Sequence, residues 1–190
     1  MIPRLKTPRG LRPASGGETT GSVRGNRVVV RPAVSSDLTA IVALERSIHE
    51  AAHWPAQEYA AMLAPVGNSA IWRYLLVADA QGELLGYAVG KLLLTSAGAL
   101  GEVENIAVAA DSRLQGIGGE LIRAVVEWCA SHGAKEVELE VRAGNHAAIA
   151  MYRRTGWRQT GRRPKYYQDP AEDAVLMTVV LPGGPARKTG

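Results

Sequence analysis

The sequence predicts an α/β protein: a mixed central sheet of about six or seven strands, flanked by helices. The order of the hydrophobic patterns indicates this class, because strand-like runs dominate residues 28–108 and strand and helix patterns then alternate to residue 181. The length of 190 residues suits one domain with a sizeable core. No internal repeat is evident in the sequence.

The basic charge of the chain is concentrated at its two ends. Residues 1–27 carry six basic residues and one acidic residue, residues 182–190 carry two basic residues, and residues 28–181 have a net charge of −3. We therefore expect a folded domain over 28–181, between a disordered basic tail over 1–27 and a flexible tail over 182–190. This distribution argues against a nucleic-acid-binding fold, and the tails would at most contact ribosomal RNA weakly.

The cysteine content and the hydropathy predict a cytoplasmic protein. The single cysteine, Cys129, lies on the apolar face of a predicted helix, which is typical of a buried thiol in a reducing compartment. No apolar run reaches the length that a membrane-spanning helix needs, so we expect no membrane partner.

The first predicted elements are a strand at 28–31 and an amphipathic helix. Pro32 ends the strand, and Ser35 or Ser36 is placed to cap the helix. The apolar positions that recur at helical spacing are Leu38, Ile41, Val42, Leu44 and Ile48.

A second short helix opens at Trp54-Pro55 and is predicted to run to Leu63. We expect it to line one wall of a substrate cleft. His49 and His53 precede it at a spacing of four residues, which could hold a metal ion on a helix. With no third ligand in view, we expect no metal site.

Three strands follow, at 71–78, 84–95 and 100–108. The connections Asp79-Ala80-Gln81-Gly82 and Ser96-Ala97-Gly98 are typical turn sequences. These strands are therefore predicted to be antiparallel neighbours.

Helices and strands alternate in the second half of the chain. A helix that Gly133 ends is predicted from the spacing of Leu121, Ile122, Val125, Val126 and Cys129. Next come a strand at 135–142, a helix from Asn145 to Thr155, and an antiparallel pair at 157–162 and 174–181 around a basic loop.

A glycine-rich loop joins the strand at 100–108 to the following helix. Its sequence is Arg113-Leu114-Gln115-Gly116-Ile117-Gly118-Gly119. Glycines there allow backbone N–H groups at a helix start to approach a phosphate. The loop does not fit a Walker motif, because Gly119 and Glu120 stand where lysine and a hydroxyl residue are needed. It does not fit a dinucleotide fingerprint either, because Leu121 replaces the third glycine.

The strand at 135–142 carries a row of carboxylates. Glu136, Glu138 and Glu140 alternate with apolar residues, so one face of this strand opens to water or to a cleft. Glu140 lies at the carboxyl end of the strand, where open α/β sheets bind their ligands, whereas Glu136 fits a solvated position. Glu102 and Glu104 on the preceding strand are alternative candidates for a catalytic base.

Asn145 and Tyr152 share one face of the next helix with Ile149. Asn145 is placed to cap the helix, a role that leaves its amide able to contact a ligand. Tyr152 is either a core aromatic or a functional hydroxyl that faces the same cleft as Glu140.

Four segments, in this order, resemble the GNAT N-acetyltransferases, and most specifically the bacterial ribosomal-protein-alanine N-acetyltransferases. They are Asn105-Ile106-Ala107-Val108, the loop Arg113–Gly119, the segment Leu139–Tyr152, and Arg163-Pro164-Lys165-Tyr166-Tyr167. The resemblance is strongest over about residues 100–180. The sequence departs from the family pattern at Trp157, where Phe is usual, and at Pro164-Lys165 in the loop that faces the acceptor peptide.

The resemblance implies the fold of this family, whose sheet is splayed where the co-substrate acetyl-CoA binds. It implies that the backbone of Ile106, Ala107 and Val108 pairs with the pantetheine arm. It assigns Glu140 as general base and Tyr152 as general acid. The remaining implied cofactor contacts, mostly to the pyrophosphate, are Leu114, Gln115, Gly116, Ile117, Gly118, Gly119 and Asn145.

The predicted reaction is the transfer of an acetyl group from acetyl-CoA to the N-terminal alanine of a small-subunit ribosomal protein. The alternatives are acetylation of a protein lysine or a small-molecule amine, and a non-catalytic regulatory module that binds acetyl-CoA. Trp54, Tyr166 and Tyr167 are the candidates for holding the acceptor peptide.

Overall fold

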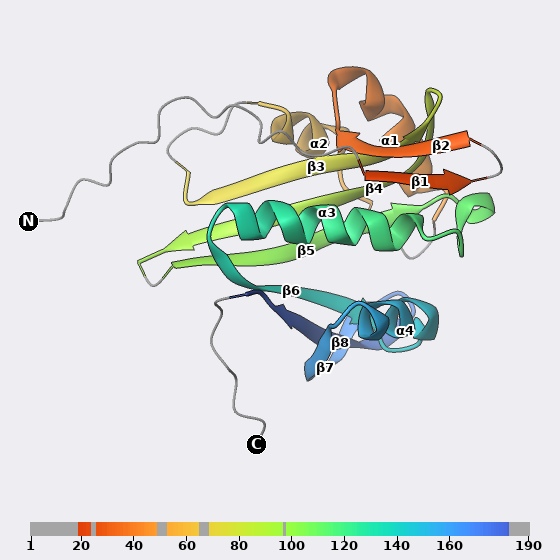
Figure 1. The fold of residues 1–190 in the computed structure, drawn as a ribbon. Helices are drawn as coiled ribbons and strands as arrows, with labels where there is room; N and C mark the ends of the chain where they lie inside the picture. Colours follow the sequence, from red (N-terminus) through yellow and green to blue (C-terminus); the bar gives the residue numbers. More distant parts are fainter. Residues whose placement is uncertain (1–18, 24–25, 49–52, 65–68, 97, 183–190) are drawn as a thin grey trace, which may run out of the picture.

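The computed structural model describes residues 19–23, 26–48, 53–64, 69–96 and 98–182. They form one eight-stranded sheet in the order β1-β2-β3-β4-β5-β6-β8-β7 (Figure 1). The strands are β1 (Thr19–Val23), β2 (Asn26–Pro32), β3 (Ile71–Ala80), β4 (Glu83–Thr95), β5 (Gly98–Val108), β6 (Ala134–Arg142), β7 (Arg158–Gln168) and β8 (Ala171–Val180).

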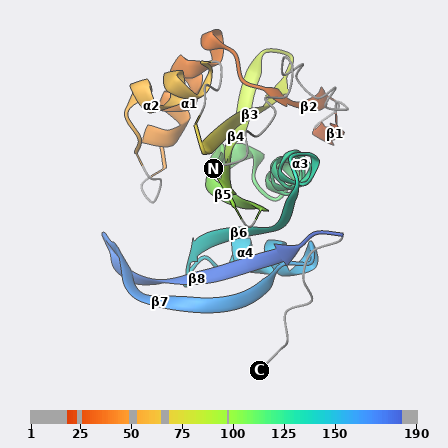
Figure 2. The same cartoon turned by 90° about the vertical axis from the view of Figure 1, so that its left-hand side faces the viewer.

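Four α-helices cover the two faces of the sheet. They are α1 (Leu38–Arg46), α2 (Ala56–Met62), α3 (Ile117–Ser131) and α4 (His146–Arg154), and the short 3-10 turns η1 (Ser35–Asp37) and η2 (Ala110–Ser112) precede α1 and α3. One core cluster packs α3 and α4 against the sheet, and a second packs α1 and α2 against the other face. Figure 2 shows α1 and α2 opposite α3, with β6, β8 and β7 turned away from β3, β4 and β5.

Helix α3 packs very closely on the sheet. Its apolar spacing buries Ile117, Leu121, Ile122, Val125 and Cys129. Two glycines on the strands beneath it allow this approach: a Cβ at Gly90 would lie 2.8 Å from Val125 Cγ1, and a Cβ at Gly101 would lie 2.8 Å from Cys129 Sγ. Any side chain at these positions would push the helix off the sheet.

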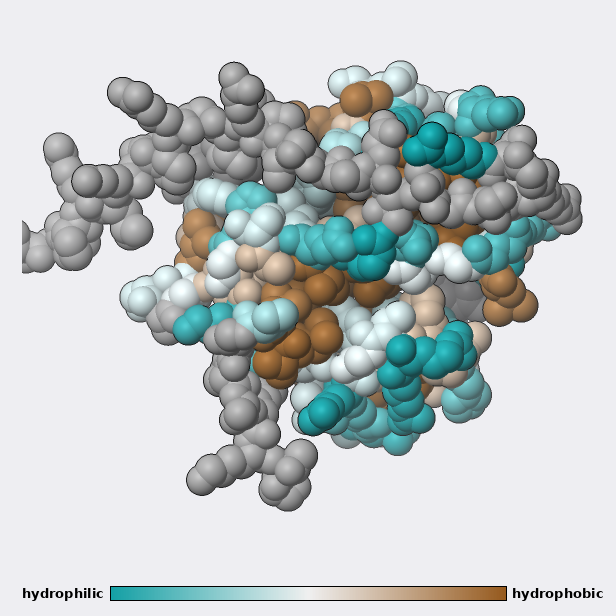
Figure 3. All heavy atoms as spheres, viewed as in Figure 1, coloured by the Kyte–Doolittle hydropathy of each residue, from teal (hydrophilic) through white to brown (hydrophobic). Residues whose placement is uncertain are grey.

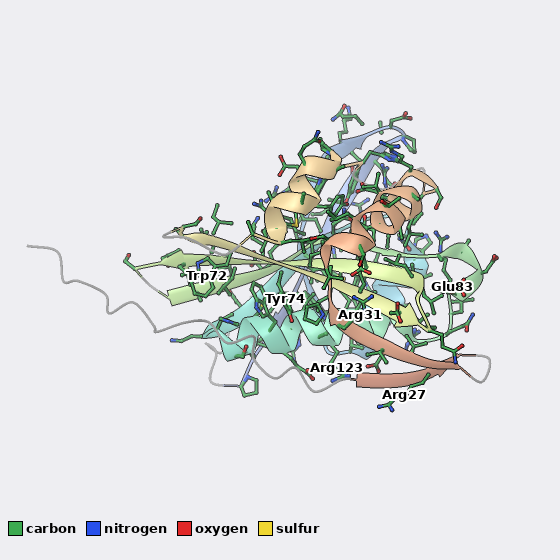
Figure 4. All side chains as sticks on the ribbon, turned by 90° about the horizontal axis from the view of Figure 1, so that it is seen from above. Arg27, Arg31, Trp72, Tyr74, Glu83 and Arg123 are labelled. Carbon is green, nitrogen blue, oxygen red and sulfur yellow. The ribbon has the colours of Figure 1, made fainter. Side chains whose placement is uncertain are left out.

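The outer face of α3 is polar. Arg123 donates to Glu120 and Glu127 at 2.6 Å each, and hydrophilic residues cross the middle of the surface there (Figure 3). At the sheet side, Tyr74 of β3 stacks on Trp128 with ring centroids 5.1 Å apart (Figure 4). The helix is therefore amphipathic in the manner that its sequence predicts.

Among the described strands, β5 and β6 form the one parallel pair, and every other neighbouring pair is antiparallel. Between β4 and β5 the register shifts, since Val89 pairs with Asn105 but Gly90 pairs with Val103. Glu104 is the extra residue of this β-bulge, which bends β5 where it leaves β6.

The predicted fold class is confirmed, with differences at the strands of lowest hydrophobicity. Strand β1 lies inside the segment 1–27 that we predicted to be disordered, and it makes the sheet eight-stranded rather than six- or seven-stranded. Strands β7 and β8 are longer than predicted and pair almost to their connecting turn. Nearly all side chains of β7 are exposed, so no apolar alternation marks this strand in the sequence.

The expectation that His49 and His53 form no metal site stays a prediction. His49 lies outside the described residues, and within the described ranges no group of three His, Cys, Asp or Glu side chains is arranged to hold a metal ion. In the same ranges, no helix is both long and apolar enough to cross a membrane.

An ion pair, rather than a serine cap, fixes the start of α1. Asp37 accepts two hydrogen bonds from Arg31, at 2.8 and 2.9 Å, and one from the backbone N–H of Val34 at 2.7 Å. The predicted cap by Ser35 or Ser36 is wrong, because the N-cap residues of η1 and α1 are Val34 and Asp37. Arg31 projects from β2 beside α1 (Figure 4), so this pair ties the helix to the sheet.

We predict that Asp37→Asn lowers the free energy of unfolding at pH 7 by about 1.5–3 kcal/mol, the range for hydrogen bonds to charged groups. The hydrogen bond from Arg31 lowers the pKa of Asp37 in the folded state. The stabilisation is therefore present above the ordinary carboxyl pKa of about 3.9 and is lost as the pH falls through the lowered folded value. Urea unfolding of both proteins between pH 3 and pH 7 measures this difference.

The matched control is Glu83→Gln, at an exposed position of the β3–β4 hairpin (Figure 4), which should change stability by less than about 0.5 kcal/mol. A difference between wild type and Asp37→Asn that stays constant down to pH 3 would contradict the assignment.

Candidate active site

The parting of β5 from β6 is the centre of the candidate site. Parallel pairing ends at Val103 and Leu139, while β5 continues to Val108 and β6 continues to Arg142. On its other edge, β5 stays paired with β4 as far as Val108. The backbone of Ile106–Val108 therefore has one edge that faces the parting instead of a strand. An extended arm that carries amide groups can pair with such an edge.

The start of α3 lies at the mouth of this parting. Gly116 is the N-cap residue and has a φ of +87°, a left-handed conformation that favours glycine. The first intrahelical hydrogen bond runs from the Glu120 N–H to the Gly116 carbonyl at 3.1 Å. The N–H groups of Ile117, Gly118 and Gly119 precede it and have no helical partner, so they can donate to an anion.

Hydrogen bonds from side chains to backbone carbonyls hold the glycine loop in place. Arg113 Nε donates to the Val108 carbonyl at 3.1 Å, and Gln115 Nε2 donates to the Asp111 carbonyl at 2.8 Å. Leu114 is fully exposed and has a φ of +61°. The loop thus presents its backbone and one apolar side chain outward, and the cofactor contacts predicted for this segment stay a prediction.

Helix α4 borders the parting on the same face as α3. A Cβ at Gly118 would lie 3.4 Å from Met151 Sδ and 3.8 Å from Val108 Cγ2, so α3, α4 and the end of β5 meet there. Asn145 caps α4, as predicted, because its Oδ1 accepts from the Ala148 N–H at 3.1 Å. The capping uses the amide oxygen and leaves the Nδ2 hydrogens for a ligand.

Tyr152 is a core residue of α4. Its side chain is 4% exposed, and its ring centroid lies 5.8 Å from that of Trp157. Burial, with a smaller effect of the nearby Tyr167, raises the pKa of the Tyr152 hydroxyl above its ordinary value. The hydroxyl is therefore a protonated donor at neutral pH.

Glu140 lines a cleft of about 290 Å³ on the other side of β6. Its Oε1 lies 2.9 Å from Nη1 of Arg163, a side chain that is 53% exposed. A hydrogen bond to Glu140 also raises the pKa of the Tyr166 hydroxyl. The other side chains that line this cleft include Glu102, Glu138, Thr160, Leu176 and Thr178.

The structure differs from the prediction that Tyr152 and Glu140 face one cleft. Leu139 and Val141, the neighbours of Glu140 on β6, belong to the core cluster that contains Tyr152. Because side chains alternate along a strand, Glu140 projects to the opposite face of the sheet. The two residues can therefore reach one ligand only through the gap where β5 and β6 part.

The alternative base candidates are held by cations on the same face as Glu140. Arg73 donates twice to Glu104, at 2.6 and 2.9 Å, and Lys91 Nζ lies 3.3 Å from Glu104 and 2.5 Å from Glu102. Burial acts to raise the pKa of Glu104, but the hydrogen bond and charge of Arg73 outweigh it and the pKa is lowered. A carboxylate with a lowered pKa is a weaker proton acceptor, which argues against Glu104 as the base.

Sequence reasoning missed a buried polar cluster behind the bulge of β5. Glu45, Tyr59 and Tyr87 are almost fully buried and are linked by hydrogen bonds to one another and to Asn105. The available signal was the position of Glu45, which stands four residues after Ile41 on the inner face of α1. A carboxylate at such a position needs buried partners.

The structure separates the three residues proposed to hold an acceptor. Tyr166 and Tyr167 lie together on β7, with ring centroids 5.2 Å apart, and Tyr166 borders the cleft of Glu140. Arg142 lies 4.2 Å from the centroid of the Tyr167 ring. Trp54 instead packs on Tyr59 beside the α2 start, with centroids 5.7 Å apart, and is not among the residues that line that cleft.

Comparison with known proteins agrees with this geometry. The model of the acetyltransferase (GNAT) family matches residues 39–157. The putative [ribosomal protein bS18]-alanine N-acetyltransferase of Bacillus subtilis is 34% identical over 110 residues, which cover 58% of this chain and 70% of that protein. The [ribosomal protein bS18]-alanine N-acetyltransferase of Escherichia coli is 33% identical over 102 residues, which cover 53% of this chain and 66% of that protein.

A solved structure with the same fold is that of the ribosomal-protein-S18-alanine N-acetyltransferase from Escherichia coli. It superimposes with a TM-score of 0.65 at 26% identity, over 85% of this chain and 97% of the other. The similarity thus extends well beyond the segment that aligns by sequence.

We predict that Gly118→Val weakens binding of acetyl-CoA about tenfold or more. The new side chain would project toward Val108 and Met151, across the N–H groups at the start of α3, and a lost charge-assisted hydrogen bond is worth about 1.5–3 kcal/mol. Isothermal titration calorimetry measures the Kd. Valine is a better helix former than glycine, so the melting temperature should not fall.

The matched control is Ala130→Val, an exposed position in the last turn of the same helix, which should leave the Kd unchanged. Equal affinity of wild type and Gly118→Val would show that the start of α3 does not bind the pyrophosphate.

Proposed function

The chain belongs to the acetyltransferase (GNAT) family, whose members use acetyl-CoA as co-substrate, and we propose that it acetylates the N-terminal alanine of a ribosomal protein. It is an N-acetyltransferase, and the names of its bacterial relatives support an acceptor of this kind. The observation that carries the proposal is the half-buried carboxylate of Glu140 beside the parted sheet, in a cleft bordered by β7. A ribosomal acceptor and the single buried thiol both favour a cytoplasmic location.

An N-terminal amine is an easier acceptor than a lysine for a single carboxylate. The reference pKa is about 7.7–8.0 for a peptide N-terminus and about 10.4 for lysine. Near pH 7.5, making the amine neutral costs roughly 4 kcal/mol for lysine and well under 1 kcal/mol for the N-terminus, at about 1.36 kcal/mol per pKa unit. This difference favours an α-amine over the lysine alternative.

Glu140 is the proposed general base. The attacking amine must lose a proton, which Glu140 accepts directly or through one water molecule. Arg163 holds the carboxylate in the free protein, and an incoming ammonium group can take the same place because it carries the same charge. Glu140 therefore orients the acceptor before it takes the proton.

Tyr152 is the proposed general acid, on the other side of the parting. The bound thioester supplies the activated acetyl group, and its sulfur leaves as a thiolate that needs a proton. The raised pKa of Tyr152 keeps its hydroxyl protonated until a charged acceptor is next to it. The proton that leaves the amine and the proton that the thiolate gains are thus transferred at opposite faces of the sheet.

The backbone of the chain makes most of the proposed contacts to the co-substrate. The free edge of Ile106–Val108 fits the amide groups of a pantetheine arm, and the helix start from Leu114 to Gly119 fits a pyrophosphate. Asn145 Nδ2 is a further donor to the same ligand. A backbone N–H near Val108 would stabilise negative charge on the acetyl carbonyl.

The decisive experiment for the acceptor compares three classes of amine. Purified protein is incubated with acetyl-CoA and peptides that begin Ala-Arg, lysine peptides blocked at the N-terminus, or polyamines, and mass spectrometry locates the acetyl group. We expect the Ala-Arg peptides to be acetylated at the α-amine fastest. In cells, the N-terminal alanine of one ribosomal protein should lose its acetyl group when the gene is deleted.

Faster acetylation of the lysine peptides or polyamines would replace the proposed acceptor by one of those classes. Tight binding of acetyl-CoA without transfer to any amine would indicate the non-catalytic module.

We predict that Glu140→Gln lowers kcat by about a hundredfold or more, the usual contribution of a general base, with little change in the Kd for acetyl-CoA. Steady-state kinetics with the best peptide and calorimetry with acetyl-CoA measure the two quantities. Glu104→Gln is the matched control. Glu104 is the first residue of β5 beyond its pairing with β6, and it too forms a salt bridge, with Arg73. It should retain most of the turnover. The reverse order of the two variants would transfer the role of base to Glu104.

A further inference from the structure

A buried polar cluster joins four elements on the face of the sheet that α1 and α2 cover (Figure 2). Glu45 of α1 is 1% exposed. Its Oε1 accepts hydrogen bonds from Tyr59 of α2 at 2.6 Å, from Tyr87 of β4 at 3.2 Å and from Asn105 of β5 at 3.1 Å. One carboxylate oxygen thus links both helices to two strands.

The two tyrosine hydroxyls of this cluster keep their protons at neutral pH. Burial, above all, raises the pKa of the Tyr59 and Tyr87 hydroxyls, so both stay protonated. Tyr59 also accepts from Asn105 Nδ2 at 3.2 Å and lies 3.0 Å from the Tyr87 hydroxyl. The surrounding side chains are apolar and include Leu75, Val77 and Val89. Apolar residues alone could therefore fill this part of the core. A buried polar network costs stability unless every member is paired, and its gain is a single defined geometry.

Asn105 lies at the point where β5 most needs such a constraint. It is the residue after the Glu104 bulge, and it lies beyond Val103, where the pairing with β6 ends. From there to Val108, hydrogen bonding within the sheet holds β5 on one edge only. The Asn105 side chain is therefore a hydrogen-bonded link through which α1 and α2 hold the free stretch of this strand, in addition to the packing of Ala107.

We propose that Glu45 is a positioning residue that acts through Asn105. It holds residues 105–108 of β5 at the separation from β6 that the co-substrate needs. The effect on turnover rests on the proposed function, whereas the effect on the strand does not. A misplacement of reacting groups by a fraction of an ångström to 1 Å can lower a rate by about ten- to a hundredfold.

Two variants separate this role from simple stabilisation. Asn105→Leu and Tyr87→Phe each remove one hydrogen bond to the same oxygen of Glu45, at nearly equal lengths of 3.1 and 3.2 Å. Each should lower the melting temperature by about 2–4 °C. Only the first removes the link to β5. Hydrogen–deuterium exchange of the 105–108 segment should speed up in Asn105→Leu alone, and kcat should fall about tenfold or more in that variant alone.

A third variant tests Glu45 itself. Glu45→Gln keeps an acceptor oxygen and should retain slow exchange at 105–108 and most of the turnover, whereas Glu45→Met, of similar size without an acceptor, should behave like Asn105→Leu. The rates are measured with whichever amine the wild-type protein acetylates fastest.

Equal exchange at 105–108 in Asn105→Leu and Tyr87→Phe would overturn the proposal, whatever the acceptor. A wild-type protein that acetylates no alanine peptide would overturn the proposed function instead, and the exchange comparison would still decide the role of Glu45.

Discussion

The parallel pairing of β5 with β6 stops at Val103 and Leu139, and the rest of the site depends on that stop. Beyond it, each strand keeps a partner on its outer edge only, so the inner backbone groups must be paired by something other than the sheet. The start of α3 and the flank of α4 close one face of the gap, and the carboxylate of Glu140 borders the other. The opening is thus built from backbone that the sheet leaves without a partner strand, and the cleft on one side of it is lined by charged side chains.

This arrangement explains why the proposed acid and base need not touch. Tyr152 belongs to the core under α3 and α4, whereas Glu140 belongs to the cleft beside β7. The sheet itself separates them, so the two proposed proton transfers would take place in different surroundings, one apolar and one open to water. A thioester that reaches through the gap would be the single ligand that both Tyr152 and Glu140 can contact.

The sequence predicts the parts of this site that local chemistry determines. The glycines of the loop, the cap at Asn145 and the place of Glu140 at a strand end follow from spacing and residue type, and each lies where predicted. The opposite faces of Glu140 and Tyr152 could not be predicted, because the face of a helical residue depends on how the crossover packs. Glu45 was missed because its three partners are distant in sequence. The predicted length of strand β7 was too short because exposed strands lack apolar alternation.

The contact between Arg163 and Glu140 would give the proposed N-terminal acceptor and its acetylated product different access to the cleft. A free N-terminus is cationic and can compete with the guanidinium for the carboxylate, but an acetylated N-terminus is a neutral amide and cannot. Once transfer is complete, the arginine regains its partner without opposition. The acetylated product would thus leave the cleft because its neutral amide does not compete with Arg163 for Glu140.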